Sequence, residues 1–261
     1  MIGDRVSVGG EPESWTIEAV QPRRSELVRR GRFGRASKVL AANLDRVFAV
    51  LALVDPPASP ELIDRLLVLI EASGMHPVLV LNKVDLEGAR GAAEGLLALY
   101  ERLGYRTLLV SAVSGEGLQP LRDMLSLGTS ALIGPSGVGK SSILNAIEPG
   151  LDLRIGKLSK KTGTGRHTTV SSRLIELECG GLVADTPGFG EVALWGVEPH
   201  DIARCYPEFR GPSETCRFRS CTHLHEPGCG VREALSEGRI PESRFLSYQK
   251  IRTEAAAAST R

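Results

Sequence analysis

The sequence lacks an apolar stretch long enough to cross a bilayer. Its longest uninterrupted apolar run covers residues 47–54, whereas a membrane-spanning helix needs about 20 apolar residues. The first residues, Met-Ile-Gly-Asp-Arg, contain no apolar core of the kind found in secretory signal peptides. Net charge is almost absent as well, at +1, so the overall charge indicates no class of partner. We expect a soluble, cytoplasmic and monomeric protein without a membrane partner.

Cysteine is scarce and unevenly distributed. The chain of 261 residues has five cysteines, and three of them lie between positions 216 and 229, beside histidines. In a cytoplasmic protein this grouping indicates a metal site rather than disulfides. Three thiolates and one imidazole suit one tetrahedral Zn²⁺ per chain and leave no open position for catalysis. His225 is a competing imidazole, and Cys179 and Cys205 are expected to be core cysteines. The predicted zinc ligands are Cys216, Cys221, His223 and Cys229.

The middle of the chain alternates apolar runs with helical stretches. Buried strands separated by amphipathic helices predict right-handed βαβ units in a parallel sheet, an α/β fold. A Gly180-Gly181 pair between two β-rich runs predicts a hairpin that adds one antiparallel edge strand. The expected strands cover residues 47–54, 77–81, 107–110, 130–133, 172–178 and 182–185, and the expected helices 61–70, 86–103 and 142–147.

Changes in composition divide the chain into three predicted units. Residues 1–43 carry short β-like pieces and a basic stretch, residues 44–198 form the α/β domain, and residues 199–261 form the zinc-binding unit. Basic stretches bind phosphate backbones or form solvated arms. The basic residues of the first unit, opposed only by Glu26, are Arg23, Arg24, Arg29, Arg30, Arg32, Arg35 and Lys38.

A phosphate-binding loop is predicted at residues 134–141. Its sequence, Gly-Pro-Ser-Gly-Val-Gly-Lys-Ser, matches the P-loop pattern at every specified position and stands between a predicted strand and a predicted helix. The glycines let backbone N–H groups converge on phosphates, and the helix N-terminus adds positive potential. Lys140 is expected to reach the β- and γ-phosphates, and the Ser141 hydroxyl to bind Mg²⁺. The expected contacts are Gly134, Pro135, Ser136, Gly137, Val138, Gly139, Lys140, Ser141 and Ser142.

Two tetrapeptides that follow predicted strands favour guanine over adenine. In Asn82-Lys83-Val84-Asp85, the Asp85 carboxylate can accept from N1–H and the N2 amino group of guanine, which adenine cannot match. The alkyl stem of Lys83 can lie along the base. In Ser111-Ala112-Val113-Ser114, backbone N–H groups can meet guanine O6. Together with the P-loop, these motifs predict a GTP site and disfavour a P-loop kinase or ATPase.

Further magnesium and γ-phosphate contacts are predicted after the P-loop. In Asp185-Thr186-Pro187-Gly188, Asp185 is placed to hold Mg²⁺ through water, and the Gly188 N–H can sense the γ-phosphate. Residues 154–173 contain six lysines or arginines and no acid. Within that segment, the hydroxyl of either Thr168 or Thr169 can complete the coordination of Mg²⁺.

Hydrolysis of GTP also needs a group that orients the attacking water. Phe189 follows Gly188, where many GTPases carry a glutamine for that purpose. His167, in the basic segment, is the predicted replacement. The alternative is that His167 only contacts a phosphate of a bound RNA.

The order of these motifs is reversed relative to an ordinary GTPase, because the base-reading tetrapeptide precedes the P-loop. This order, with Arg-His-Thr-Thr, Asp-Thr-Pro-Gly-Phe and the Cys/Cys/His/Cys cluster, resembles the ribosome small-subunit-dependent GTPase A (RsgA) family over residues 3–248. The resemblance implies an N-terminal OB-fold, a circularly permuted GTPase domain and a C-terminal zinc domain. It also implies GTP hydrolysis that is stimulated by the 30S subunit, late in the maturation of that subunit, with 16S rRNA as a contact.

The chain departs from this family at its start. Sequence of the type Val-Gly-Asp-Arg-Val normally occurs late in the family's OB-fold, and here it stands at residues 2–6. A five-stranded barrel cannot close without its first half. We therefore expect a truncated, OB-like β segment, unless the start codon was chosen too far downstream. The basic stretch supports a different functional class, an RNA-binding module in which the nucleotide is purely structural. Measuring GTP turnover with and without 30S subunits distinguishes this module from the GTPase.

Overall fold

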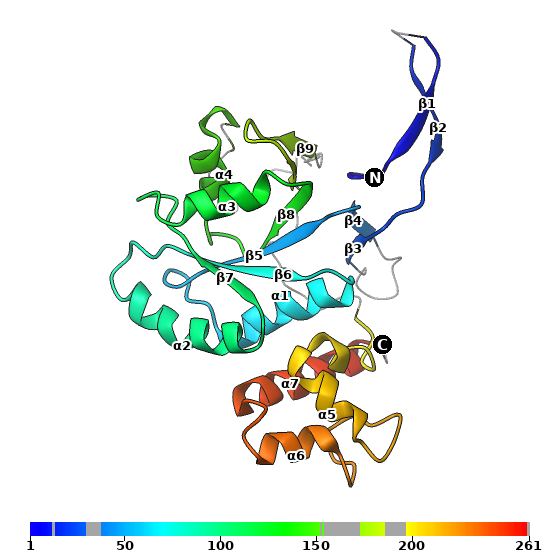
Figure 1. Ribbon diagram of the computed structural model, residues 1–261, viewed down its shortest axis with the longest axis vertical. Coiled ribbons are helices and arrows are strands. Elements are labelled where there is room, and N and C mark those ends of the chain that lie inside the picture. The colour runs from blue at the N-terminus through cyan, green and yellow to red at the C-terminus, as the bar shows by residue number, and fades with distance from the viewer. Residues whose placement is uncertain (12–13, 30–37, 152, 154–172, 186–196, 260–261) are drawn as a thin grey trace, which may run out of the picture.

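A six-stranded sheet forms the centre of the structure, a computed structural model that describes residues 1–11, 14–29, 38–151, 153, 173–185 and 197–259 (Figure 1). The strands stand in the order β7-β6-β5-β8-β10-β9. The first five are parallel, and β9 runs antiparallel to β10 at the edge, as the sequence predicted. These strands are β5 (Arg46–Ala52), β6 (Pro77–Asn82), β7 (Arg106–Leu109), β8 (Thr129–Ile133), β9 (Arg173–Glu176) and β10 (Leu182–Asp185).

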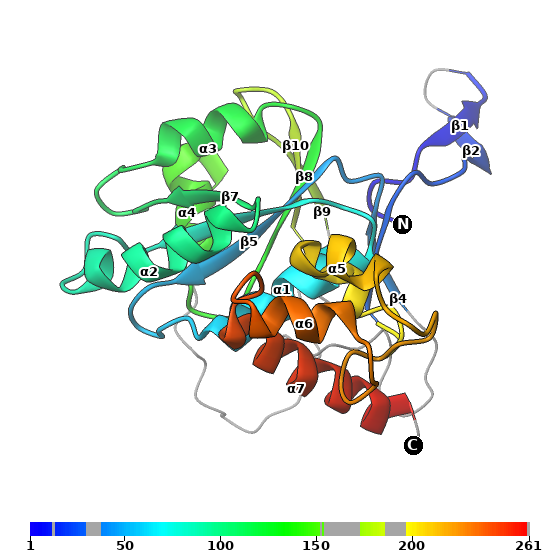
Figure 2. The ribbon, with the colours of Figure 1, turned by 60° about the horizontal axis from the view of Figure 1, so that its bottom comes forward.

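Helices cover both faces of this sheet (Figure 2). Strand β5 shows why, because its residues are buried in alternation on the two sides: Leu51 packs with α1 and α2, and Phe48 with α3 and α4. A fully buried central strand of a parallel sheet is apolar on both faces. The helices are α1 (Pro60–Ala72), α2 (Ala89–Arg102), α3 (Leu118–Leu125) and α4 (Lys140–Ile147). Among the described residues, no helix is long and apolar enough to cross a membrane.

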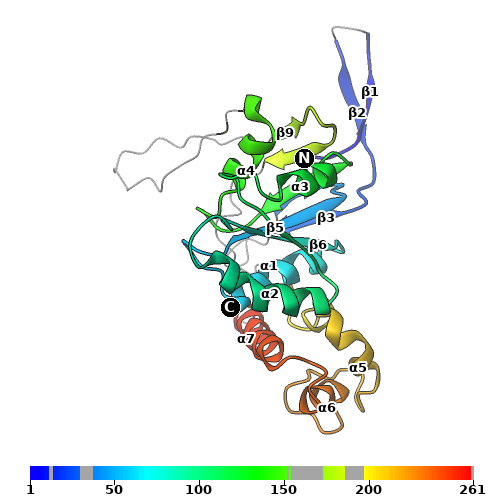
Figure 3. The same ribbon diagram turned by 60° about the vertical axis from the view of Figure 1, so that its left-hand side comes forward.

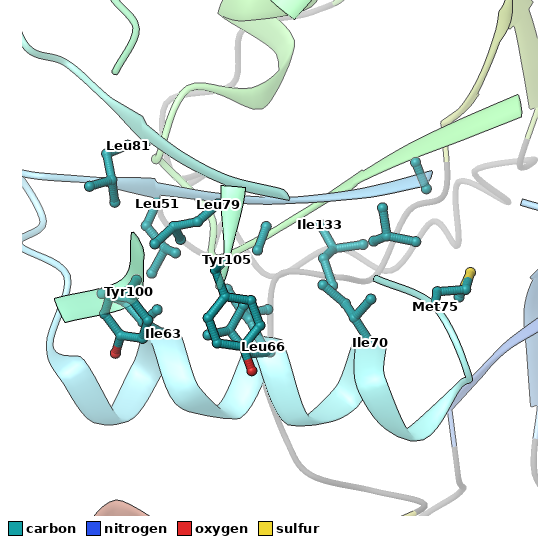
Figure 4. Packing of buried hydrophobic residues seen from close by; sticks show 14 of the residues in the cluster. Leu51, Ile63, Leu66, Ile70, Met75, Leu79, Leu81, Tyr100, Tyr105 and Ile133 are labelled. Carbon is teal, nitrogen blue, oxygen red and sulfur yellow. The ribbon is translucent and has the colours of Figure 1, made fainter. Parts of the chain in front are cut away.

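Helix α1 lies directly beneath the sheet (Figure 4). It begins where the Ser59 hydroxyl accepts a 3.2 Å hydrogen bond from the Leu62 N–H, with Pro60 in the first turn, both favourable for a helix start. Ile63, Leu66 and Ile70 point from one face of α1 into the sheet. Their spacing is that of a helix with one apolar face.

The N-terminal residues form two separate hairpins instead of a closed barrel within the described part of the chain. Strands β1 (Val6–Gly9) and β2 (Thr16–Val20) project away from the body (Figures 1 and 3), and Ile17 is 67% exposed. Strands β3 (Glu26–Arg29) and β4 (Lys38–Ala42) were not expected from the sequence. They form because Leu27 and Ala41, set among basic residues, are fully buried in the same core as α1.

The C-terminal unit packs against α1 on the side away from the sheet (Figures 1 and 2). Its core is a group of aromatic rings from Tyr206, Phe209 and Tyr248, with centroids 5.0–5.5 Å apart. Val68 of α1 is buried in the same cluster. The alanine-rich tail extends the last helix. The helices of this unit are α5 (Arg210–Glu214), α6 (Gly230–Ser236) and α7 (Glu242–Ser259).

Ion pairs join the C-terminal unit to α1. Arg244 of α7 is 1% exposed and donates to Asp64 of α1, which is fully buried. The same guanidinium binds both carboxylate oxygens of Glu208, at 2.6 and 3.2 Å, and lies 4.4 Å from the centroid of the Tyr206 ring. Tyr100 of α2 donates a 2.7 Å hydrogen bond to Asp64. Three more pairs surround this buried group: Arg65 with Glu254, Lys250 with Glu61, and Arg210 with Glu71.

Candidate nucleotide site and metal centre

The predicted nucleotide motifs lie at one edge of the sheet. Each follows the carboxyl end of a parallel strand: residues 82–85 follow β6, residues 111–114 follow β7, and residues 134–141 follow β8. Strand β8 returns to the sheet beside β5, on the side away from β6, so the strand order reverses between β5 and β8. In open α/β sheets, ligands bind at such a reversal point, outside the carboxyl ends of the strands.

The P-loop requires glycine because the chain passes close to β5. Gly134 has a φ of 155°, and a Cβ atom there would lie 2.0 Å from the Val50 carbonyl oxygen. Helix α4 begins at Lys140, so the free N–H groups of its first turn face the loop. Ser141 and Ser142 stand in that turn, half-buried. This strand–loop–helix geometry is the structural context that the P-loop pattern requires.

Lys140 folds back onto its own loop. Its Nζ donates 2.7 Å hydrogen bonds to the carbonyl oxygens of Gly134 and Pro135. Burial lowers the pKa of the Lys140 ammonium group to about 8, because desolvation disfavours the charged form. An anion bound in the loop would place a negative charge beside this ammonium group.

The base-reading motif and the P-loop touch directly. The Asn82 side-chain amide donates a 2.8 Å hydrogen bond to the Val138 carbonyl oxygen. Gly139, with a φ of 97°, leaves room for this contact, since a Cβ atom there would lie 2.2 Å from Asn82 Nδ2. Asn82 is 1% exposed, and its Oδ1 has no partner among the described residues. Asn82 thus joins two motifs that are far apart in sequence, which motif spacing alone does not reveal.

Ser111 joins the two tetrapeptides that are predicted to bind guanine, residues 82–85 and 111–114. Its hydroxyl donates a 2.6 Å hydrogen bond to Asp85 and accepts hydrogen bonds from the N–H groups of Val113 and Ser114. Ser111 is fully buried, whereas Asp85 is exposed and Val113 is 87% exposed. The Asp85 carboxylate is thereby held at the surface, where a base can reach it. Ser111 was predicted for its backbone only, and its hydroxyl is the functional group that the sequence did not reveal.

Lys83, the second residue of the base-reading motif, has an unusual backbone conformation. Its φ is +67°, and its Nζ donates to the Asp55 carbonyl oxygen in the loop after β5. Val84, next to it, is buried at 3% exposure, and Ala112 packs against the core beside α3. The Lys83 stem is therefore fixed at the edge of the sheet where the predicted base site lies.

Several predicted residues lie outside the described part of the chain. These are His167, Thr168, Thr169, Gly188 and Phe189. Asp185 is the last residue of β10, at the same sheet edge as the P-loop, and its backbone pairs with Arg173. The roles given to these residues remain predictions.

The four predicted metal ligands come together in the C-terminal unit. The ligand atoms of Cys216, Cys221, His223 and Cys229 all lie within 4.8 Å of one another, so they could hold a metal ion. His223 Nδ1 is 3.5 Å from Cys216 Sγ and 3.4 Å from Cys229 Sγ, which identifies Nδ1 as the nitrogen that faces the thiols. Burial lowers the pKa of His223 and favours the neutral imidazole that binds metals. His225, the competing imidazole, is exposed and not part of the cluster.

Glu226 organises the loop around His223, a role that sequence analysis missed. Its carboxylate accepts hydrogen bonds from the N–H groups of Thr222, Leu224 and His225 at 2.9–3.3 Å. Burial opposes ionisation, yet hydrogen bonds from Thr222 and from backbone N–H groups hold the pKa of Glu226 well below its ordinary value. The position of an acid directly after two histidines of a cysteine cluster was the available signal.

The two remaining cysteines differ from each other. Cys205 is 1% exposed and belongs to the core of the C-terminal unit, as predicted, and burial raises the pKa of its thiol to about 12. Cys179 is only half-buried, because it lies in the turn between β9 and β10 and packs at the rim of the core.

A family model described as RsgA GTPase matches residues 20–195 of this chain. The protein named small ribosomal subunit biogenesis GTPase RsgA from Gemmatimonas aurantiaca is 45% identical over 264 aligned residues, which cover 99% of this chain and 85% of that relative. The protein of the same name from Histophilus somni strain 2336 is 46% identical, over 91% of this chain and 68% of that relative.

Two solved structures share this architecture. The crystal structure of YjeQ from Thermotoga maritima superposes with a TM-score of 0.81 at 36% identity, over 97% of this chain and 84% of that one. The structure of YloQ, a circularly permuted GTPase, superposes with a TM-score of 0.77 at 30% identity, over 98% of this chain and 80% of that one. The reversed motif order, the joined nucleotide motifs and these similarities agree, and the chain belongs to the RsgA family of circularly permuted GTPases.

Proposed function

We propose that this chain hydrolyses GTP to GDP and phosphate in the late maturation of the 30S ribosomal subunit. The observation that carries the proposal is the hydrogen bond by which Asn82, in the base-reading motif, holds Val138 of the P-loop. It joins the motif that is predicted to read guanine to the loop that is predicted to bind the phosphates, which supports one shared site. The names of the relatives, small ribosomal subunit biogenesis GTPase, support the ribosomal role.

Each predicted nucleotide contact has a proposed role. Asp85 reads the guanine edge, residues 111–113 meet guanine O6, and residues 134–142 cradle the phosphates, with Lys140 on the β- and γ-phosphates. Mg²⁺ would neutralise part of the charge of the phosphates when it is bound. Its proposed contacts are Ser141, Asp185 through water, and either Thr168 or Thr169, while the Gly188 N–H meets the γ-phosphate.

We assign the Cys/Cys/His/Cys cluster to one structural Zn²⁺. Three thiolates and an imidazole match the donor set that zinc prefers, and four protein ligands leave no open position. The clustering of the ligand atoms within 4.8 Å supports this assignment. The metal would add to the hydrophobic core that holds this small unit together.

Three units remain the proposed division of the chain: residues 1–43, 44–198 and 199–261.

The 30S subunit and its 16S rRNA are the proposed partners, and the protein is proposed to act in the cytoplasm as a monomer. Within the first unit, Arg23 pairs with Asp4 and Glu26, and Arg24 with Asp45. These two arginines of the basic stretch are therefore partly neutralised.

GTP turnover with and without 30S subunits tests the proposal. We expect slow hydrolysis by the protein alone and faster hydrolysis on the subunit, with GTP preferred over ATP. Binding to 30S subunits should be tighter with a non-hydrolysable GTP analogue than with GDP, at one fixed salt concentration. GTP binding without any turnover would favour an RNA-binding module with a structural nucleotide, and a preference for ATP would favour a P-loop ATPase or kinase.

His167 is the proposed group that orients the attacking water. His167→Ala should keep nucleotide affinity and lose 30S-stimulated hydrolysis, because Phe189 cannot orient water. His225→Ala, which changes an exposed histidine outside the metal cluster, is the matched control. If His167→Ala is stimulated normally, the histidine contacts RNA or has no role in the reaction.

A further inference from the structure

The loop between the first two cysteines of the metal cluster presents an aromatic ring between two arginines. Phe218 is 43% exposed, and Arg217 and Arg219 are exposed on either side of it. The guanidinium carbon of Arg217 lies 5.5 Å from the centroid of the Phe218 ring. Neither arginine has an acidic partner within the part of the chain that the structure describes. A large apolar ring and two uncompensated cations are thus held together at the surface.

This loop is fixed at both ends. The Arg217 N–H donates a 2.9 Å hydrogen bond to the Gly228 carbonyl oxygen, and the Cys221 N–H donates to the Phe218 carbonyl oxygen at 3.2 Å. Cys216 and Cys221, which flank the loop, belong to the clustered ligands. A site that is ordered before its ligand arrives loses little conformational entropy on binding.

A surface cavity of about 560 Å³ adjoins the ring. Arg204, Arg210 and Arg219 line it together with Phe218, and Glu214 is the acid among its lining residues. Three of the clustered ligands, Cys216, Cys221 and His223, also line it, so the cavity adjoins the candidate metal centre and includes part of it. Arg204 pairs with Asp201 at 3.2 Å at the surface, whereas Arg210 pairs at 3.1 Å with Glu71, whose side chain is only 9% exposed. The exposed Arg204–Asp201 pair contributes little and is readily exchanged for another anion. Arg219 has no acidic partner among the described residues.

We propose that this surface binds an unpaired nucleotide of an RNA strand, with the base stacked on Phe218 and a neighbouring phosphate in the cavity beside Arg219. The inference rests on the proposed function, because it is the partner's RNA that would supply the strand. Stacking on an aromatic ring requires an unstacked base, so loops and single strands bind and duplexes do not. An acidic protein would satisfy the arginines but would leave the exposed ring without a flat partner.

Binding of a fluorescein-labelled oligouridylate, followed by anisotropy, tests this surface. Phe218→Ala should weaken binding about 5- to 150-fold, the effect of losing one base–aromatic stack, and Phe218→Trp should preserve it. Leu246→Ala, which removes another exposed apolar side chain of the same unit, is the matched control. Arg219→Ala should reduce the slope of log affinity against log salt by about 0.7. Zinc content shows whether each variant keeps its metal cluster.

The outcomes separate this inference from the proposed function. Oligouridylate affinity that is unchanged in Phe218→Ala, or lowered equally by Leu246→Ala, overturns the stacking site. Equal losses for a duplex RNA and for oligouridylate also overturn it, because only the charge would then matter. If Phe218→Ala binds oligouridylate normally but no longer binds 30S subunits, Phe218 contacts a ribosomal protein and the stacking site is overturned. Failure of the unmodified protein to respond to 30S subunits counts against the proposed function, whatever the Phe218 variants do.

Discussion

Asn82 is the residue at which the predicted base-reading motif and the P-loop meet. Its amide is buried, its donor end holds the P-loop at Val138, and Gly139 leaves the necessary space. Ser111 has a comparable place in the guanine motif, since its hydroxyl ties Asp85 to the following backbone N–H groups. Each of these small polar side chains fixes the position of a neighbour that is predicted to contact the nucleotide.

Asp85→Asn is expected to lower GTP affinity about 10- to 150-fold, because a hydrogen bond to a charged group is worth about 1.5–3 kcal/mol. The amide presents a donor where guanine also donates, so preference should shift toward xanthosine triphosphate. Titration of both nucleotides measures the shift. Glu87→Gln removes a neighbouring exposed carboxylate and should have no effect. Unchanged GTP affinity in Asp85→Asn would remove Asp85 from the site.

Nucleotide affinity should fall as the pH rises above about 8. Burial lowers the pKa of Lys140 to about 8 in the free protein, and bound phosphate, an anion, would raise it. Binding therefore takes up a proton above pH 8, and affinity should drop by up to about tenfold per pH unit there. The folded protein alone responds oppositely, because a lowered lysine pKa makes folding more favourable as pH rises from about 8 toward the unfolded value.

Lys140→Met provides the comparison for this pH effect. The variant should bind nucleotide weakly at every pH and should lack the added decline above pH 8, apart from the ionisation of guanine itself. Calorimetry of GDP binding at pH 7, 8 and 9 measures both. Parallel pH profiles for the two proteins would show that Lys140 does not titrate in this range.

At the scale of elements, the loop that carries His223 owes its shape to one carboxylate. Glu226 collects three backbone N–H groups, and His223 adopts a φ of +61° within the loop. That left-handed conformation is uncommon for a residue other than glycine and is maintained by its surroundings. The four clustered ligands then close the loop against α6.

His223→Ala should lose the metal, and His225→Ala should keep it. Only His223 belongs to the cluster, whereas His225 is exposed. Elemental analysis should find one zinc per chain in the unmodified protein and in His225→Ala. Small metal-stapled units unfold when the metal is removed, so His223→Ala should also lose the tertiary structure of the C-terminal unit. Zinc bound in His223→Ala at the normal stoichiometry would refute this ligand assignment.

Local patterns predicted most of the GTPase domain and missed contacts between distant segments. The strands and helices around residues 47–147 were predictable because apolar runs and amphipathic stretches report burial directly. Strands β3 and β4 were not, since Leu27 and Ala41 become core residues only through packing with α1. For the same reason the P-loop was evident from its sequence, while its contact with Asn82 depends on the order of strands in the sheet.

At the scale of the whole molecule, α1 is shared by two cores. Ile63, Leu66 and Ile70 pack under the sheet, Val68 packs into the C-terminal unit, and Asp64 binds Arg244 of α7. Among the described residues, four ion pairs cross this interface, and one of them is fully buried. The C-terminal unit is thereby fixed to the helix that follows the central strand β5, not only to the chain segment that follows β10.

Arg244→Met should destabilise the protein by about 3–5 kcal/mol, because it leaves the buried carboxylates of Asp64 and Glu208 without their partner. Lys250→Met removes an exposed pair with Glu61 at the same interface and should cost only about 0–1 kcal/mol. Urea unfolding measures both free energies. Equal and small effects of the two substitutions would show that the buried network does not hold the units together.

The shared helix α1 has a consequence for the order in which the chain folds as it is synthesised. Domains form from the N-terminus while the rest of the chain is still being made. Helix α1 and all strands of the sheet precede Glu242–Ser259 in the chain, so Asp64 and Val68 lack their partners in the C-terminal unit until that unit has been synthesised. The nascent GTPase domain therefore carries one uncovered helix face until α7 arrives. Arg244 of α7 completes the burial of the Asp64 carboxylate, which is synthesised much earlier. A chain that ended before Arg244 would keep this carboxylate exposed.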